Sequence, residues 1–306
     1  MSRFGAWLGA LTLLLASPAE AATPLEVVEA APGLFVHVGR HEDFTPENVG
    51  GIANLAFIVG DASVAVIDTG GSREQGEALL AAIRQRTTLP ISHVVNTHVH
   101  PDHLLGNAAI AEAGAIVVGH AKLPERLAET GPYYVANMQR LLGDAFEGTE
   151  IVPPTLLVAD RLRIDLGNRA LELRAWPTAH TNTDLTVLDE RTGTLLAGDL
   201  VFLERLPVID GSLLGWLTVM DELASLPAAR VVPGHGPAIA PWPAALEPQR
   251  SYLASLRDRI RAALRGNHTL EEAVSSVPLP PGYSWLLADE NHARNVTTSY
   301  TELEWE

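Results

Sequence analysis

The chain has 306 residues, and 37 acidic against 21 basic side chains give it a formal net charge of −16. Hydrophobic residues make up 47% and charged residues 19%, so the chain can bury a large core and is not disordered. The acidic balance argues against a nucleic-acid partner, because phosphate binding requires clustered cations. The absence of cysteine excludes thiol nucleophiles, thiolate ligands and disulfides, so any metal must be held by histidine and carboxylate.

The N-terminus has the layout of a secretory signal peptide. Arg3 precedes an apolar run over residues 4–16, and the small-residue pattern Ala19-Glu20-Ala21 follows. The run is too short to span a bilayer, which requires roughly 20 apolar residues. A retained anchor or a buried helix is the alternative. We therefore expect residues 1–21 to be removed, leaving no membrane anchor, and the mature protein to be exported to a bacterial periplasm.

The mature chain alternates strands and helices. In the first half, strands are predicted at residues 25–30, 34–38, 53–59, 64–68, 91–96 and 115–119, and helices at 73–86 and 104–113. In the second half, strands are predicted at residues 162–166, 170–175, 184–188, 194–197 and 230–233, and helices at 216–224 and 244–265. This alternation predicts an α/β fold in one domain over residues 22–306, with C-terminal helices from about residue 243.

Histidines are densest where the predicted strand at 91–96 ends. The sequence there is Thr97-His98-Val99-His100-Pro101-Asp102-His103. On extended backbone, residues two apart point the same way, so His98 and His100 can converge on one ion. Pro101 suits the first turn of a helix, which would place Asp102 and His103 beside that ion. An isolated His-x-His is more often a surface turn, but the full pattern after a buried strand favours a metal site.

Three further strands end in a residue that can bind a metal, namely His180, Asp199 and His235. Each has glycine or proline close by, which lets the backbone turn sharply. One such residue alone is usually a cap or a surface group. Four such strand ends in one chain, at one sheet edge, predict a shared site.

These residues resemble the signature of the metallo-β-lactamase fold superfamily, over roughly residues 25–240. The resemblance implies a four-layer αβ/βα sandwich with metals at the sheet edge between its halves. It implies His98, His100 and His180 around one ion, Asp102, His103 and His235 around the other, and Asp199 bridging both. Asp68, in Ile67-Asp68-Thr69-Gly70, resembles the first motif of the superfamily, and we expect it to orient a ligand imidazole.

Asp199 departs from the pattern of many β-lactamases of this fold, which have cysteine there and a lysine soon after. Here Leu200-Val201-Phe202-Leu203 follows, so the chain resembles the glyoxalase II-like and general hydrolase branches instead. Residues 96–109, 176–189, 198–216 and 294–306 also resemble secreted zinc metallohydrolases of quinoprotein relay systems. That narrower resemblance implies a link to a pyrroloquinoline-quinone (PQQ) dehydrogenase and to sulfur oxidation.

The ligand set predicts a binuclear zinc hydrolase. Zinc lowers the pKa of a bound water from about 15.7 to about 7, which supplies a hydroxide for attack on a small ester, thioester, lactone or amide. Asp102 could also accept a proton, as a catalytic residue. Iron or manganese would suit the same ligands. The alternatives are a mononuclear iron dioxygenase of sulfur species, using His98, His100 and His180, and a metal-binding protein without catalysis.

Few residues are predicted as substrate contacts. Arg205 could hold an anionic group of a small-molecule substrate, and His120, His41 and the loop at 42–51 could border the site. Aromatic residues that form either an apolar wall or part of the core are Tyr133, Tyr134, Phe202 and Trp216.

Overall fold

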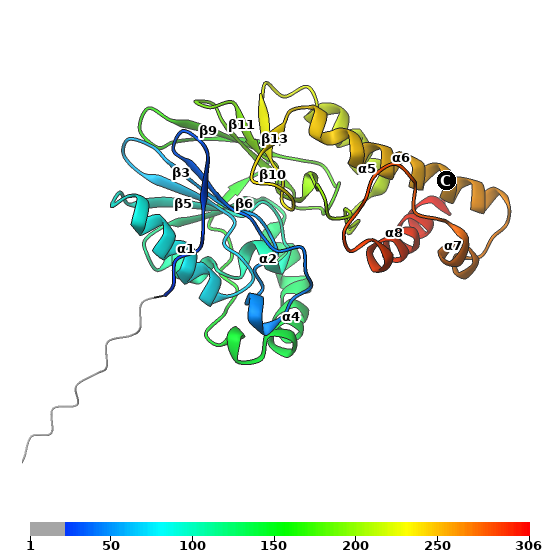
Figure 1. Cartoon of the computed structure of the whole chain (residues 1–306), viewed down its shortest axis with the longest axis horizontal. Helices are drawn as coiled ribbons and strands as arrows, with labels where there is room; N and C mark the ends of the chain where they lie inside the picture. The colour runs from blue at the N-terminus through cyan, green and yellow to red at the C-terminus, as the bar shows by residue number, and fades with distance from the viewer. Residues whose placement is uncertain (1–21) are drawn as a thin grey trace, which may run out of the picture.

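Two β-sheets lie face to face in the computed structural model, which describes residues 22–306 (Figure 1). The first sheet has the order β1 (Val28–Ala31), β2 (Leu34–His37), β3 (Leu55–Val59), β4 (Val64–Ile67), β5 (Ile91–Val95), β6 (Ile116–His120), β7 (Leu156–Val158). The second has the order β13 (Ala240–Pro241), β12 (Arg230–Val232), β11 (Thr194–Leu196), β10 (Leu185–Asp189), β9 (Ala170–Ala175), β8 (Arg161–Asp165).

Helices lie outside the two sheets. They are α1 (Arg73–Arg86), α2 (Pro101–Leu104), α3 (Asn107–Ala111), α4 (Leu123–Leu142), α5 (Leu213–Leu223), α6 (Glu247–Arg265), α7 (Leu270–Ser276) and α8 (Ala288–Leu303). Of these, α1 and α3 pack on the first sheet and α5 and α6 on the second, while α7 packs on α8 and α8 on α6. Alternate side chains of a strand point to opposite faces, so Phe57 of β3 packs with α1 and α3 while Ile58 faces the second sheet. Leu195 of β11 packs with α5 and α6. The predicted four-layer α/β sandwich is confirmed.

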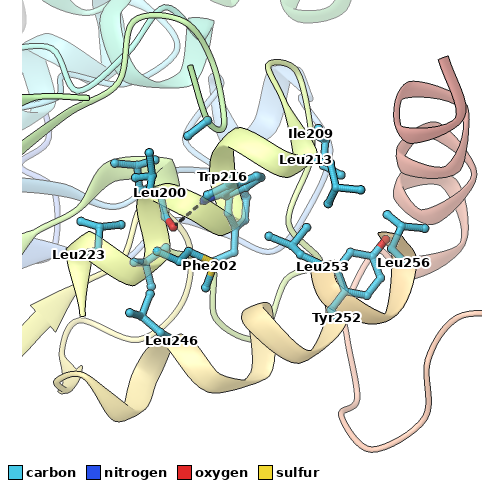
Figure 2. Packing of buried hydrophobic residues seen from close by; sticks show 14 of the residues in the cluster. Leu200, Phe202, Ile209, Leu213, Trp216, Leu223, Leu246, Tyr252, Leu253 and Leu256 are labelled. Carbon is cyan, nitrogen blue, oxygen red and sulfur yellow. Dashed lines mark hydrogen bonds between the residues drawn. The ribbon is translucent and has the colours of Figure 1, made fainter. Parts of the chain in front are cut away.

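The C-terminal helices extend the outer layer of the second sheet, at the end of the molecule away from α1 (Figure 1). Figure 2 shows the buried cluster that joins α6 to α5 and to the segment after β11, with Trp216 at its centre. The Trp216 indole donates a hydrogen bond to the Leu200 carbonyl at 3.1 Å. Since Trp216 is fully buried there, it belongs to the core and not to a substrate wall.

The structure differs from the predicted elements at two helices, and strands β7 and β13 were not predicted. The helix predicted at 104–113 is divided into α2 and α3 near Gly106, where a Cβ would come within 2.2 Å of the Thr69 carbonyl oxygen. Close packing of backbone on backbone interrupts the helix there. Helix α4 was not predicted at all, because Gly131 and Pro132 in its middle are residues that usually break helices.

Both sheets present strand ends at a common edge. Strands β4 and β5 are parallel, as are β11 and β12, and β9 runs in the same direction as β11 because each is antiparallel to β10. The segments that leave these strands are joined across the sandwich. Thr97, after β5, accepts a hydrogen bond from the Leu185 N–H at 2.7 Å, and Gly234, after β12, accepts one from the Asn54 N–H at 2.8 Å.

The predicted signal peptide at residues 1–21 lies outside the described part of the chain. Within residues 22–306, no helix combines the length and the apolar character needed to cross a membrane.

A buried ion pair ties the two sheets together and gives a test of the fold. Arg169 and Asp189 are 1% and 0% exposed and are joined by hydrogen bonds of 3.1 and 2.6 Å, while Arg169 also donates to the Val59 carbonyl of β3 at 2.9 Å. Arg169→Met leaves the Asp189 carboxylate buried and unpaired, so we expect a loss of about 3–5 kcal/mol in the free energy of unfolding, measured in urea.

The matched control is Arg163→Met, which removes an arginine whose pair with Glu190 is solvent-exposed. Its unfolding midpoint should change little, because exposed ion pairs contribute little to the free energy of unfolding. Similar losses in the two variants would contradict the role assigned to the buried pair.

Candidate metal centre

Three imidazoles meet where β5 and β9 end. The His100 Nδ1 atom lies 3.1 Å from His98 Nε2 and 3.0 Å from His180 Nε2. Asp199 Oδ2 lies 3.3 Å from His180 Nε2 and 3.6 Å from His98 Nε2. We call these four residues, whose inward-facing atoms all lie within 4.8 Å of one another, the first ligand group. It combines the predicted ligands of one ion with the predicted bridging carboxylate.

Asp102, His103 and His235 form a second ligand group beside the first. Asp102 Oδ2 lies 3.7 Å from His103 Nε2 and 3.4 Å from His235 Nε2. Asp199 Oδ1 lies 3.2 Å from His103 Nε2, and Asp199 Oδ2 lies 3.4 Å from His235 Nε2. The structure thus brings all seven predicted ligands together, with the Asp199 carboxylate between the two groups.

Two glycines let the strand ends around Asp199 approach closely. Gly198 has φ +50°, a left-handed conformation that glycine adopts without strain, and a Cβ there would come within 2.6 Å of Thr97. A Cβ on Gly234 would come within 2.0 Å of Asp199 Oδ1. The glycines beside the predicted ligands are therefore required by the close approach of the two strand ends.

Two of the ligand imidazoles are held by carboxylates on their outward side. His103 Nδ1 donates to Asp68 Oδ2 at 2.8 Å, and His100 Nε2 donates to Asp210 Oδ2 at 3.1 Å. Although burial favours the neutral acid, the hydrogen bond from His100 and the nearby positive charge of Arg294 lower the pKa of Asp210 to about 2, so Asp210 is ionised at neutral pH. A carboxylate on the outer nitrogen keeps the N–H there and leaves the inner nitrogen as a lone pair.

Backbone carbonyls hold two more imidazoles in the same way. His180 Nδ1 lies 2.7 Å from the Val208 oxygen, and His235 Nδ1 lies 2.8 Å from the Ile52 oxygen. Because a carbonyl only accepts hydrogen bonds, each of these Nδ1 atoms carries the proton. The Nε2 atoms, which face the ligand groups, are then free to bind a metal.

Asp68 fixes two imidazoles at once, in agreement with its expected orienting role. It follows β4 in a left-handed conformation, φ +59°, and accepts hydrogen bonds from the N–H and hydroxyl of Thr97 at 2.8 and 2.7 Å. Since the Thr97 hydroxyl donates to Asp68, its oxygen can accept from His98 Nδ1 at 3.0 Å. Asp68 therefore orients His103 directly and His98 through Thr97.

The electrostatics of the site suit divalent cations. Burial lowers the pKa of His180 to about 3 and that of His98 well below its usual value, so both rings are neutral near pH 7. Burial opposes protonation of His103 as well, but Asp199, Asp102 and Asp68 outweigh it and raise the pKa of His103.

The carboxylates thus attract positive charge to a place where neutral imidazole lone pairs converge. His103 Nε2 and Asp199 Oδ1 lie 3.2 Å apart without the geometry of a hydrogen bond, and both are buried with no hydrogen-bond partner among the described residues. Because buried polar atoms are nearly always paired, these two atoms indicate missing partners. Imidazole nitrogen and carboxylate oxygen are zinc ligands, and the two groups fit two ions.

A cavity of about 430 Å³ opens onto both ligand groups. Its metal-facing side includes His100, Asp102, His180, Asp199 and His235, its apolar side includes Phe44, Ile52, Tyr134, Phe202 and Val208, and its basic side chains are Arg126, Arg205 and Arg294. The Phe202 ring stacks on His235, with ring centroids 5.0 Å apart. The site is therefore accessible to a small molecule with both apolar and charged parts.

The residues that were predicted as substrate contacts do not all line the cavity. Arg205, Tyr133, Tyr134 and Phe202 line the cavity. His120 does not line it: the side chain is buried, and its Nδ1 accepts a hydrogen bond from the Lys122 N–H at 3.0 Å, in the turn that leads into α4. This placement corrects the prediction that His120 contacts substrate. His41 also lies outside the lining and pairs with Glu204 at 3.0 Å.

Sequence reasoning missed Asp210, Arg126 and Arg294. Asp210 stands in Ile209-Asp210-Gly211, which is similar to the motif around Asp68, an apolar residue followed by aspartate with a glycine close behind. That likeness was the one available signal. The two arginines lie on α4 and α8 and carry no local pattern that marks them.

Comparison with known proteins agrees with this architecture. The model of the metallo-beta-lactamase superfamily matches residues 49–235, more than half of the chain. A linear primary-alkylsulfatase from Pseudomonas sp. is 24% identical over 255 residues, which cover 71% of this chain and 48% of that protein. The chain thus spans about half the length of this curated relative.

Solved structures share the fold. A stereoselective inverting sec-alkylsulfatase from Pseudomonas sp. aligns with a TM-score of 0.68 and 20% identity, covering 91% of this chain and 50% of that one. A metallo-beta-lactamase from Pontibacter korlensis aligns with a TM-score of 0.62 and 23% identity, covering 75% of this chain and 99% of that one. The chain belongs to the metallo-β-lactamase superfamily, which confirms the predicted family and supports a metal-dependent hydrolase.

The hydrogen bonds around Asp68 give a test of the metal centre. Asp68→Asn keeps the shape of the side chain but removes the charge that holds His103 and Thr97. We expect metal affinity to fall about tenfold to a hundredfold, measured by titration against a competing chelator. The control Asp258→Asn removes an exposed carboxylate on α6 and should leave the affinity unchanged. Unaltered affinity in Asp68→Asn would contradict the orienting role.

Proposed function

We propose that this member of the metallo-β-lactamase superfamily is a binuclear zinc hydrolase that cleaves a small ester, thioester, lactone or amide. The observation that carries the proposal is the position of Asp199, which belongs to the first ligand group and also faces the second. Its Oδ2 atom lies 3.3 Å from His180 Nε2, while Oδ1 and Oδ2 lie 3.2 and 3.4 Å from the Nε2 atoms of His103 and His235. A mononuclear iron dioxygenase would need only the first group. The second group, Asp102, His103 and His235, is equally complete and buried, which favours two ions.

The residues of the chain have distinct tasks in this proposal. Two zinc ions would lower the pKa of a water molecule and polarise the scissile bond. Asp102 belongs to the second group and also lines the cavity, so it can accept a proton from the attacking water. Phe44, Ile52 and Phe202 provide an apolar wall that limits the access of bulk water.

Hydrolysis of a sulfate ester is the second candidate. It is supported by the similarity to the alkylsulfatases and by the three arginines in the cavity, which suit an anionic substrate. The reacting group would then itself be charged, unlike that of a neutral ester.

Export and metabolic context are further parts of the proposal. The signal-peptide pattern of residues 1–21 supports a periplasmic location. The resemblance of residues 96–109, 176–189, 198–216 and 294–306 to quinoprotein relay metallohydrolases supports a link to a PQQ dehydrogenase. We propose a small molecule as the substrate and no nucleic acid as a partner.

Metal removal and a panel of substrates test the proposed chemistry. Zinc-loaded protein should hydrolyse at least one of a set of 4-nitrophenyl esters, thioesters, lactones, anilides and alkyl sulfates. Chelation should abolish the activity and zinc should restore it. Asp102→Ala should lower kcat by about 10²-fold or more, because a proton acceptor is lost.

The control for this variant is Asp221→Ala, which removes an exposed carboxylate of α5 and should leave kcat unchanged. Equal rates for the wild type and Asp102→Ala would show that the ligand groups are not the catalyst. One iron per chain together with oxygen uptake would favour the dioxygenase.

A further inference from the structure

Arg205 is a buried cation that has no counter-charge of its own. It lines the cavity and is 9% exposed. Its Nε and Nη1 atoms are buried and have no hydrogen-bond partner among the described side chains. Burying a polar group without a partner is unfavourable, and burying a charge is more so. An unpaired guanidinium in a cavity therefore indicates a site completed by a ligand.

The other two arginines that line the cavity each lie near a carboxylate. Arg126 Nη2 lies 3.8 Å from Asp210 Oδ2, and its Nη1 lies 3.3 Å from Glu129. Arg294 Nη2 lies 3.6 Å from Asp210 Oδ1. Asp210 is thus shared between two arginines and His100. The remaining carboxylates of the cavity, Asp102 and Asp199, face the ligand imidazoles.

The backbone holds Arg205 in a fixed position relative to the ligand groups. Its N–H donates to the Leu203 carbonyl at 2.7 Å, and Arg205 forms a parallel bridge with Leu286. The same segment begins at Asp199, a ligand, and continues to Val208, whose carbonyl holds His180 at 2.7 Å. Both ends of the segment that carries Arg205 are therefore attached to the metal centre.

We propose that Arg205 binds an anionic oxygen group of the substrate, a carboxylate or a sulfate. This inference rests on the proposed hydrolase and narrows its substrates to anionic esters. A guanidinium offers several N–H donors in one plane, which match the oxygens of either group. The apolar wall of Phe44, Ile52 and Phe202 would contact the hydrocarbon part of the same molecule.

The charge of the cavity supports an anionic ligand. The whole chain carries a net charge of −16. In the cavity, three arginines balance the three carboxylates of Asp102, Asp199 and Asp210. Divalent ions in the ligand groups would make the cavity positive, so it would attract anions into an otherwise acidic protein.

A matched pair of substrates tests the role of Arg205. Mono(4-nitrophenyl) glutarate carries a carboxylate away from the reacting bond, and 4-nitrophenyl pentanoate lacks it. For the zinc-loaded wild type, we expect a higher kcat/KM with the glutarate. In Arg205→Gln this preference should fall about tenfold to a hundredfold, mainly through KM, and Arg205→Lys should retain part of it. The surface control Arg163→Gln should keep the full preference.

Octyl sulfate forms a second arm, in which the charge belongs to the reacting group. A loss confined to octyl sulfate in Arg205→Gln would mean that Arg205 binds the scissile group. A loss confined to the glutarate would mean that it binds a remote group. Either result supports the inference. The inference is overturned if Arg205→Gln leaves both the preference for the glutarate and the kcat/KM for octyl sulfate unchanged.

Stability and binding separate this inference from the proposed function. Because Arg205 is an unpaired buried cation, Arg205→Gln should unfold at the same temperature as the wild type or at a higher one. Calorimetric titration of the zinc-loaded protein with pentanoate should give at least tenfold weaker binding in Arg205→Gln. Binding that depends on Arg205 without any hydrolysis would refute the proposed function alone. Hydrolysis with a charge preference independent of Arg205 would refute the inference alone.

Discussion

The metal centre depends on one constraint, namely that each ligand imidazole is hydrogen-bonded on the nitrogen that faces away from the ions. Asp68, Asp210, Val208 and Ile52 accept these bonds directly from four of the rings. Burial keeps His98 and His180 neutral, and the outer acceptors decide which nitrogen presents its lone pair. Without them the rings could rotate or carry a proton on the inner nitrogen, and the two ligand groups would not form.

The sandwich is what brings these acceptors to the imidazoles. Asp68 follows β4 and lies next to the segment after β5, whereas Asp210 and Val208 belong to the loop between β11 and α5. Helix α8 fixes that loop. Asn295, fully buried, accepts from the Ile209 N–H at 2.9 Å and donates to the Pro207 carbonyl at 2.7 Å. The C-terminal helices thus position part of the metal centre, in addition to covering the second sheet.

The features that the sequence predicts correctly are those set by residues close together along the chain. The spacing of His98, His100, Asp102 and His103 after an apolar strand, and the glycines beside Asp199 and His235, were sufficient to identify candidate ligands. The alternation of strands and helices predicted an α/β fold, and the family resemblance implied the four-layer sandwich. Features set by distant contacts were missed. Asp210 meets His100 across 110 residues and meets Arg294 on α8, and no local pattern encodes either contact. His120 shows the opposite error: it ends a strand at the same sheet edge and was expected to border the site, but it is buried and accepts a hydrogen bond from the backbone of the turn that leads into α4.

The central claim is that two ions lie between the seven ligands and share Asp199. Anomalous diffraction at the zinc edge, from crystals of protein purified without chelator, tests it most directly. Two peaks should appear about 3.5–4 Å apart, one among His98, His100 and His180 and the other among Asp102, His103 and His235. A single peak, or peaks outside these residues, would contradict the account.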